Sequence, residues 1–180
     1  MAAVVEETIT LDPDKEYEIV NGVPEKKEMA GARHGRVGAK LLARLSMFAE
    51  ENGLGVVYGP DTTFKVGANE RLPDISLVSA ERIPEDGDPE GIWQLAPDLA
   101  VEVISPNDVY ERLMDKVFDY LDAGVRQVWL ISPEHEFITI YHSLTESKTL
   151  TENDLLTCEE LLPGFSCKVG DLFALPKRQQ

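Results

Sequence analysis

The 180-residue sequence lacks several features that would narrow its function at once. No apolar run approaches the roughly 20 residues that cross a bilayer, and the N-terminus has no basic start followed by a long apolar segment, so we expect a cytoplasmic protein without membrane contact. The two cysteines, Cys158 and Cys167, have no partner at zinc-finger spacing, which predicts reduced and packed thiols. The Gly-x-x-x-x-Gly-Lys phosphate loop and the Gly-x-Ser-x-Gly elbow are also absent, which argues against the reactions built on them.

Basic residues are scarce. The chain has 17 Lys and Arg against 33 Asp and Glu, which gives a formal net charge of −16. This charge argues against nucleic-acid binding over a broad electrostatic surface and leaves a local basic patch, a bound metal ion or both as the routes to phosphate. The hydrophobic content of 43% and the chain length fit one folded domain spanning residues 1–180.

The first half of the chain predicts a hairpin, a helix and strands. Asn21-Gly22 is a strong turn signal within EYEIVNGVPEKKEM, and Pro24 places the second arm of this hairpin at a sheet edge. Apolar spacing predicts a helix at about 33–51. Strands follow in GVVYG, DTTFKV and LPDISLVS, with GANE as a turn before the third of them and residues 80–97 as a loop.

The second half completes an α/β pattern. DLAVEVIS, RQVWLIS and FITIYHS read as strands, and a helix is expected at 108–122. Short strands are predicted in KTLT, LLT and CKVGDLF near the C-terminus. The segment 98–131 should form a right-handed, parallel strand–helix–strand unit, so the fold class is α/β with a mixed sheet.

One strand carries a charge in an apolar setting. Alternate residues of DLAVEVISP point to opposite faces of the strand, and Glu102 is the only charged residue between Asp98 and Ser105. A lone ionised carboxylate is costly to bury, so such groups are paired, protonated or bound to metal. Asp74 raises the same question because it opens the strand DISLV after Leu-Pro.

The acids and one lysine are placed to converge. Two acids on neighbouring strands meet at one end of a sheet, which is the all-oxygen setting that Mg²⁺ prefers. On the helix 108–122, the apolar stripe of Val109, Leu113, Val117 and Tyr120 has Lys116 at its edge. A lysine in that position buries its stem and directs its ammonium to the end of the sheet. Asp74, Glu102 and Lys116 therefore form a candidate site.

These motifs resemble a known family. An Asp, a Glu on the next long strand and then a Lys form the pattern of the PD-(D/E)XK nuclease superfamily. More specifically, PDISLVSAERIP, PDLAVEVISPND, YLDAGV and VWLISP resemble, in order and spacing, the Uma-type family of putative restriction-endonuclease-like proteins over about residues 15–145. The resemblance implies a restriction-endonuclease-like core, a mixed β-sheet flanked by helices, here with additional small strands near the C-terminus.

The resemblance also implies a chemistry. The protein would be a metal-dependent DNA endonuclease in which Asp74 and Glu102 hold Mg²⁺ or Mn²⁺, with the backbone carbonyl of Val103 as a further ligand. The metal would lower the pKa of a bound water, and Lys116 would orient that water and stabilise the developing negative charge. Because many nucleases cut two strands with two sites, a homodimer is expected by analogy.

The sequence departs from the superfamily pattern at one position. The lysine normally lies two residues after the Glu, where this chain has Ile104. The Uma-type pattern is similar to a branch in which the lysine has moved to the following helix, and Lys116 occupies that place. Alternatives stay open for each residue: Asp74 as a turn cap, Glu102 in a buried ion pair, and Lys116 as a solvated helix residue.

The predicted helix at 33–51 offers a second feature. Its four basic residues recur at intervals of three, four and four on one face: Arg33, Arg36, Lys40 and Arg44. They fit either contact with a nucleic-acid backbone or a solvated face that pairs with the many acids. His34 is either near the site or a surface histidine. One of the preceding acids, Glu18, Glu25 or Glu28, is expected near the metal by resemblance to the superfamily.

Two function classes therefore follow from the sequence. The first is a metal-dependent DNA endonuclease that uses Asp74, Glu102 and Lys116. The second is a non-catalytic interaction or nucleic-acid-binding module on a nuclease-like scaffold, which the strong acidity and the missing lysine at position 104 favour. Loss of metal-dependent cleavage in a Glu102 variant separates the two.

Overall fold

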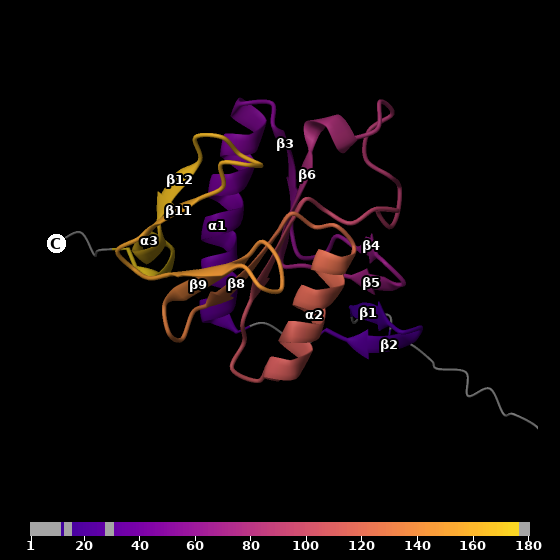
Figure 1. Cartoon of the computed structure of the whole chain (residues 1–180), viewed down its shortest axis with the longest axis horizontal. Helices are drawn as coiled ribbons and strands as arrows, with labels where there is room; N and C mark the ends of the chain where they lie inside the picture. Colours follow the sequence, from indigo (N-terminus) through magenta and orange to yellow (C-terminus); the bar gives the residue numbers. More distant parts are fainter. Residues whose placement is uncertain (1–11, 13–15, 28–30, 177–180) are drawn as a thin grey trace, which may run out of the picture.

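A computed structural model describes residues 12, 16–27 and 31–176, and its centre is a six-stranded mixed sheet (Figure 1). The strands follow the order β10-β9-β8-β7-β6-β3. Their bounds are β3 (Gly55–Tyr58), β6 (Ile75–Ser79), β7 (Leu99–Val103), β8 (Gln127–Ser132), β9 (Phe137–Tyr141) and β10 (Ser147–Leu150). β7 and β8 are parallel and the other pairs are antiparallel, so the predicted mixed sheet and its parallel crossover are both confirmed.

The two long helices cover opposite faces of this sheet (Figure 1). α1 (Ala32–Glu51) packs Val37, Leu41 and Leu45 against one face, and α2 (Tyr110–Asp122) packs Val117 and Tyr120 against the other. Residues of β7 alternate between these two apolar cores as the period of a strand requires. Glu102 therefore faces α2, the helix that carries Lys116.

A second, four-stranded sheet lies beside α2 in the order β2-β1-β5-β4 (Figure 1). It contains β1 (Tyr17–Val20), β2 (Val23–Lys26), β4 (Phe64–Val66) and β5 (Asn69–Arg71). The turn between β1 and β2 has φ of 51° at Asn21 and 78° at Gly22, as a type I′ turn demands. β2 is an edge strand, so the prediction for Pro24 is also confirmed.

The prediction was wrong for two short segments. GANE is not all turn, because Asn69–Arg71 forms β5. The inward side chains of β5, Asn69 and Arg71, are polar and donate hydrogen bonds to Asp119. The strand therefore lacks the alternating apolar residues by which a strand is predicted. CKVGDLF is a strand only in β12 (Ser166–Lys168), which pairs with β11 (Leu155–Thr157), and it continues as α3 (Val169–Phe173). Val169, Leu172 and Phe173 recur at helical spacing and are buried, which favours the helix.

Two smaller expectations also changed. α2 begins at Tyr110, so Val109 is its exposed N-terminal flank and not part of the apolar stripe. The loop 80–97 contains a 3₁₀ turn (Ala80–Arg82) and the buried Trp93, which bridges to Phe64.

The prediction of reduced thiols is confirmed for both cysteines. Cys158 and Cys167 are free thiols, and burial raises their pKa values to about 12 and about 11. Among the described helices, none combines the length and apolar character needed to cross a membrane.

Candidate active site

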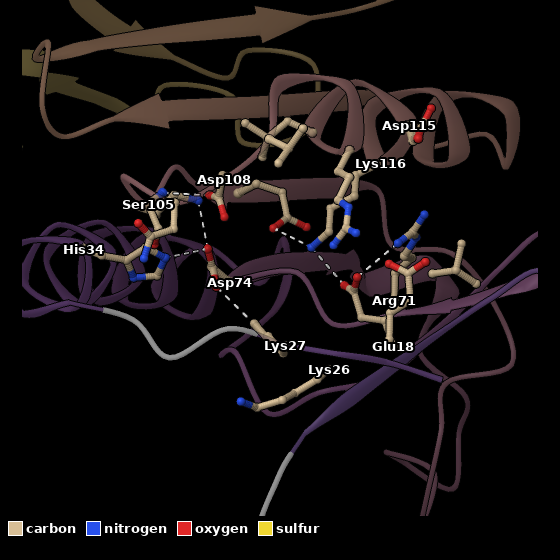
Figure 2. A pocket seen from close by; sticks show the side chains of 18 residues that line it. Glu18, Lys26, Lys27, His34, Arg71, Asp74, Ser105, Asp108, Asp115 and Lys116 are labelled. Atoms are coloured by element: carbon tan, nitrogen blue, oxygen red, sulfur yellow. Dashed lines mark hydrogen bonds and ion pairs between the residues drawn. The ribbon is translucent and has the colours of Figure 1, made fainter. Parts of the chain in front are cut away.

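A cavity of about 260 Å³ opens between the β1–β2 hairpin and α2, and the ends of β6 and β7 form its inner wall (Figure 2). Its lining includes all of the residues predicted for the site, namely Asp74, Glu102, Val103 and Lys116. The hairpin contributes Glu18, Glu25, Lys26 and Lys27, and the first turn of α1 contributes His34. The long-range convergence that the sequence predicted is therefore present.

Asp74 lies directly before β6 and is 8% exposed. Its Oδ2 accepts hydrogen bonds from the backbone N–H of Val103 at 2.8 Å and from Nε2 of His34 at 3.1 Å, and its Oδ1 lies 3.2 Å from Nζ of Lys27. Burial would raise the pKa of Asp74, but these donors outweigh burial and hold the pKa at about 2. Asp74 is therefore an ionised, acceptor-only group.

Glu102 lies within β7 and is 5% exposed. Its Oε1 accepts a hydrogen bond of 2.8 Å from the hydroxyl of the buried Tyr120, and its Oε2 accepts one of 3.2 Å from Nζ of Lys116. Burial raises the pKa of Glu102, and the nearby charge of Asp74 raises it further, while Lys116 opposes both. The two acids thus repel each other across the cavity, which a cation between them would relieve.

Lys116 bridges two carboxylates (Figure 2). Its Nζ lies 3.0 Å from Oε1 of Glu18 and 3.2 Å from Oε2 of Glu102. Burial would lower the pKa of Lys116, but the two acids outweigh burial and raise it above its ordinary value. Lys116 is therefore a fixed cation at neutral pH and not a proton acceptor.

Of the three N-terminal acids considered from the sequence, Glu18 has donors on both of its carboxylate oxygens. Its Oε1 accepts from the backbone N–H of Leu72 and from Lys116, and its Oε2 lies 3.0 Å from Nη1 of Arg71. Burial would raise the pKa of Glu18, but Lys116, Arg71 and the Leu72 amide outweigh it and lower it. Glu18 therefore ties the hairpin to α2 and to the segment before Asp74.

The other two acids differ in position. Glu25 lies opposite Glu18 in the hairpin and lines the cavity as an exposed side chain. Glu28 lies outside the described residues. His34, which the sequence left open, is close to the site: burial would lower its pKa, but Asp74 outweighs burial and raises it. The Nδ1 atom of His34 is buried and has no hydrogen-bond partner among the described residues.

The chemistry of these donors fits a hard divalent cation. Two carboxylates and the backbone of Val103 line one cavity, and Mg²⁺ is commonly held by one or two carboxylates, with water and substrate phosphate as its other ligands. No group of three or more His, Cys, Asp and Glu side chains within the described residues is arranged to hold a metal ion without such help. The donor types therefore suit a hard divalent cation that keeps water or substrate among its ligands.

The basic face of α1 does not line the cavity. Arg36 donates to the backbone carbonyls of Phe173 and Ala174, and Lys40 donates to those of Asp171 and Ala174. These contacts satisfy the carbonyls at the C-terminal end of α3, as basic side chains commonly do. Arg33 pairs with Glu134, and Arg44 donates to its own helix at the Lys40 carbonyl. Arg33 therefore matches the expected solvated face that pairs with acids, whereas Arg36, Lys40 and Arg44 are half-buried and hold backbone carbonyls, which neither reading from the sequence predicted.

Three members of the site escaped the sequence analysis. Lys27 touches Asp74, Arg71 holds Glu18, and Tyr120 donates to Glu102. Tyr120 was assigned only to the apolar stripe, although it lies four residues after Lys116 and so on the same side of α2. Arg71 and Lys27 carry no local signal, because their roles depend on pairing between β1, β2 and β5.

Comparison with known proteins agrees with this fold. The crystal structure of "a putative nuclease belonging to DUF820" from Anabaena variabilis superposes with a TM-score of 0.82 at 20% sequence identity, covering 91% of this chain and 93% of that chain. No curated protein matches the sequence. The model of the Uma2 family, described as "Putative restriction endonuclease", matches residues 5–170. By this match over most of its length, the chain belongs to the Uma2 family of putative restriction endonucleases.

Proposed function

We propose that the protein is a metal-dependent DNA endonuclease that hydrolyses phosphodiester bonds. The observation that carries the proposal is the convergence of Asp74, Glu102 and Lys116 in one cavity, in a chain whose family is described as "Putative restriction endonuclease". The fold likeness to "a putative nuclease" from Anabaena variabilis supports the same reaction class.

Each group has a distinct task in the proposed reaction. The carboxylates of Asp74 and Glu102, with the carbonyl of Val103, would hold Mg²⁺ or Mn²⁺. When bound, the ion would polarise a phosphoryl oxygen and lower the pKa of a water. Lys116, as a fixed cation, would stabilise the charge that develops on the phosphate and orient the attacking water. His34 would act as a positioning residue that keeps Asp74 ionised and oriented.

A specific observation favours a second candidate. Both candidate ligands already have a cationic partner in the chain, since Lys27 contacts Asp74 and Lys116 contacts Glu102. A non-catalytic interaction or nucleic-acid-binding module would use these contacts only to hold the fold together. In that case a Glu102 variant changes stability and leaves partner binding intact.

The test combines metal binding with cleavage. Mn²⁺ is titrated by calorimetry into the wild type, Glu102→Ala and Asp98→Asn, and the same proteins are incubated with supercoiled, linear and branched DNA plus Mg²⁺ or Mn²⁺. Asp98 is the matched control, because it is a buried, ion-paired acid that precedes β7 and lies outside the cavity.

Metal binding and cleavage that persist in Asp98→Asn but vanish in Glu102→Ala would support the nuclease. Metal-dependent cleavage that is equal in all three proteins would rule out this site. The absence of any cleavage, with partner binding kept in Glu102→Ala, would favour the non-catalytic module.

The expected homodimer is also part of the proposal. β10 ends the large sheet, and an edge strand offers unpaired backbone groups to a second copy. Light scattering at micromolar concentration decides the matter: twice the mass of 20.0 kDa supports the dimer, and the monomer mass removes it.

A further inference from the structure

Lys27 is a second lysine at the site and belongs to neither of the strands that carry the acids. It follows β2, and its side chain is 17% exposed. Its Nζ lies 3.2 Å from Oδ1 of Asp74, 2.9 Å from the carbonyl oxygen of Leu72 and 3.4 Å from that of Pro60. Figure 2 shows Lys27 reaching Asp74 from the hairpin side, away from Lys116.

The two oxygens of Asp74 are not equivalent. Oδ2 accepts from the Val103 amide and from His34, whereas Oδ1 has Lys27 as its partner. Backbone and ring donors on Oδ2 are held in place by β7 and α1, while an ammonium on a flexible stem can leave. A second cation therefore reaches Asp74 most easily through Oδ1, in competition with Lys27.

The two lysines would respond differently to such a cation. Lys116 keeps Glu18 as an ionic partner even when the charge of Glu102 is shared with a metal. Lys27 is left with the carbonyls of Leu72 and Pro60, which are neutral. Among the described residues, its ammonium would then have no carboxylate in contact and would feel only the more distant charge of Glu16, beside a cavity that, under the proposed function, receives a phosphate.

We propose that Lys27 is a substrate-binding cation of the nuclease site, held on Asp74 until a metal ion takes its place and then free to contact the phosphate. The inference rests on the proposed function. In the metal-free protein Lys27 neutralises Asp74 and so competes with the metal. In the loaded site the same ammonium adds attraction for the negatively charged phosphate.

This exchange predicts opposite effects of one substitution. Lys27→Met keeps the length of the side chain and removes its charge, so it should bind Mn²⁺ about tenfold more tightly, because a competing positive charge is gone. The same variant should cleave DNA at least about tenfold more slowly, because the phosphate loses a cationic contact. A merely structural lysine would lower both the affinity and the rate, whereas a mere competitor would raise the affinity for Mn²⁺ and leave cleavage at saturating metal unchanged.

The test measures Mn²⁺ affinity by calorimetry, and cleavage at saturating metal, for the wild type, Lys27→Met, Lys27→Arg and Lys65→Met. Lys65 is the matched control, because its Nζ also contacts one carboxylate, Glu70, and one carbonyl, Ala68, but lies outside the cavity. Melting temperatures of the four proteins verify folding. We expect Lys27→Arg to retain most of the cleavage and Lys65→Met to resemble the wild type.

The outcomes separate the inference from the proposed function. If the wild type binds metal and cleaves DNA but Lys27→Met does not bind metal more tightly, or cleaves as fast as the wild type, the role of Lys27 is wrong and the nuclease stands. If the wild type neither binds metal nor cleaves, the proposed function fails and takes this inference with it. Tighter metal binding together with slower cleavage supports both.

Discussion

The backbone amide of Val103 donates a hydrogen bond of 2.8 Å to Oδ2 of Asp74. Val103 directly follows Glu102, so this bond fixes one candidate ligand against the residue next to the other. It joins the N-terminal end of β6 to the C-terminal end of β7, which are antiparallel neighbours in the sheet. The spacing of the two carboxylates is therefore set by backbone geometry and does not depend on flexible side chains alone.

This arrangement predicts how stability depends on pH. The folded protein holds the pKa of Asp74 at about 2, below its ordinary value of 3.8, so the ionised form is the stabilising one. Ionised Asp74 contributes about 2 kcal/mol to the free energy of unfolding. This contribution is complete above about pH 4 and is lost as the pH falls toward 2. Urea unfolding of the wild type and Asp74→Asn should show a stability gap that narrows by this amount between pH 5 and pH 2. A gap that is constant with pH would contradict the ionised, donor-rich Asp74.

Tyr120→Phe removes the hydroxyl that donates to Glu102 at 2.8 Å. Both residues are buried, so the substitution leaves a carboxylate oxygen without its donor, and we expect a loss of about 1–3 kcal/mol in the free energy of unfolding. Tyr58→Phe is the matched control: its hydroxyl donates to Asp88 at 2.7 Å at the surface, where water replaces the partner at little cost. Chemical denaturation measures both. Equal losses in the two variants would show that burial of Glu102 does not increase the cost of removing its hydrogen-bond donor.

Much of the fold follows from the sequence, because its main signals are periodic. The alternation of apolar residues in β7 and β8 and the helical spacing in α1 and α2 are each carried by a single segment. β5 was missed because its inward residues, Asn69 and Arg71, are polar and gain their stability from Asp119, 50 and 48 residues away in sequence. A pattern within β5 holds no information about that partner.

Some residues of the candidate site could also be predicted from local sequence, whereas others could not. Asp74 and Glu102 stand out because an acid in an apolar strand needs a partner, and Lys116 follows from its place at the edge of an apolar stripe. The hairpin residues that complete the site were not predictable. Glu18 could not be preferred over Glu25 or Glu28, because only the packing of β1 against β5 directs it to Arg71 and Lys116.

The basic face of α1 should stabilise the fold and not the complex with DNA. Arg36 and Lys40 donate at 2.8 Å and 2.9 Å to carbonyls of Phe173 and Asp171, so the double variant Arg36→Ala/Lys40→Ala removes the donors at the end of α3. We expect faster amide hydrogen exchange in α3 and an affinity for DNA within about threefold of the wild type. Unchanged hydrogen exchange together with a large loss of DNA affinity would instead support contact between this face of α1 and a nucleic-acid backbone.

DNA binding should depend on a divalent metal ion. Six acids and five lysines or arginines line the cavity, so with His34 neutral the formal charge of the lining is −1. The acids are Glu18, Glu25, Asp74, Glu102, Asp108 and Asp115. The bases are Lys26, Lys27, Arg71, Arg112 and Lys116. A phosphate meets no net attraction there until a metal adds two positive charges. Fluorescence anisotropy with labelled DNA should show weak binding in EDTA and strong binding with Ca²⁺, a cation that also takes oxygen ligands.

Arg112 offers the sharpest test of where the DNA lies. It is exposed on α2, lines the cavity and makes no hydrogen bond or ion pair with any residue in the described part of the chain. Such a side chain is available to one phosphate, so Arg112→Ala should weaken binding in Ca²⁺ about fivefold and reduce the slope of log affinity against log salt by about 1. Lys148→Ala, which removes an exposed charge from β10 far along the sheet order from β6 and β7, should leave the slope unchanged. Equal effects of the two substitutions would mean that the acidic chain attracts DNA only through its general field, and that the strand does not pass over this cavity.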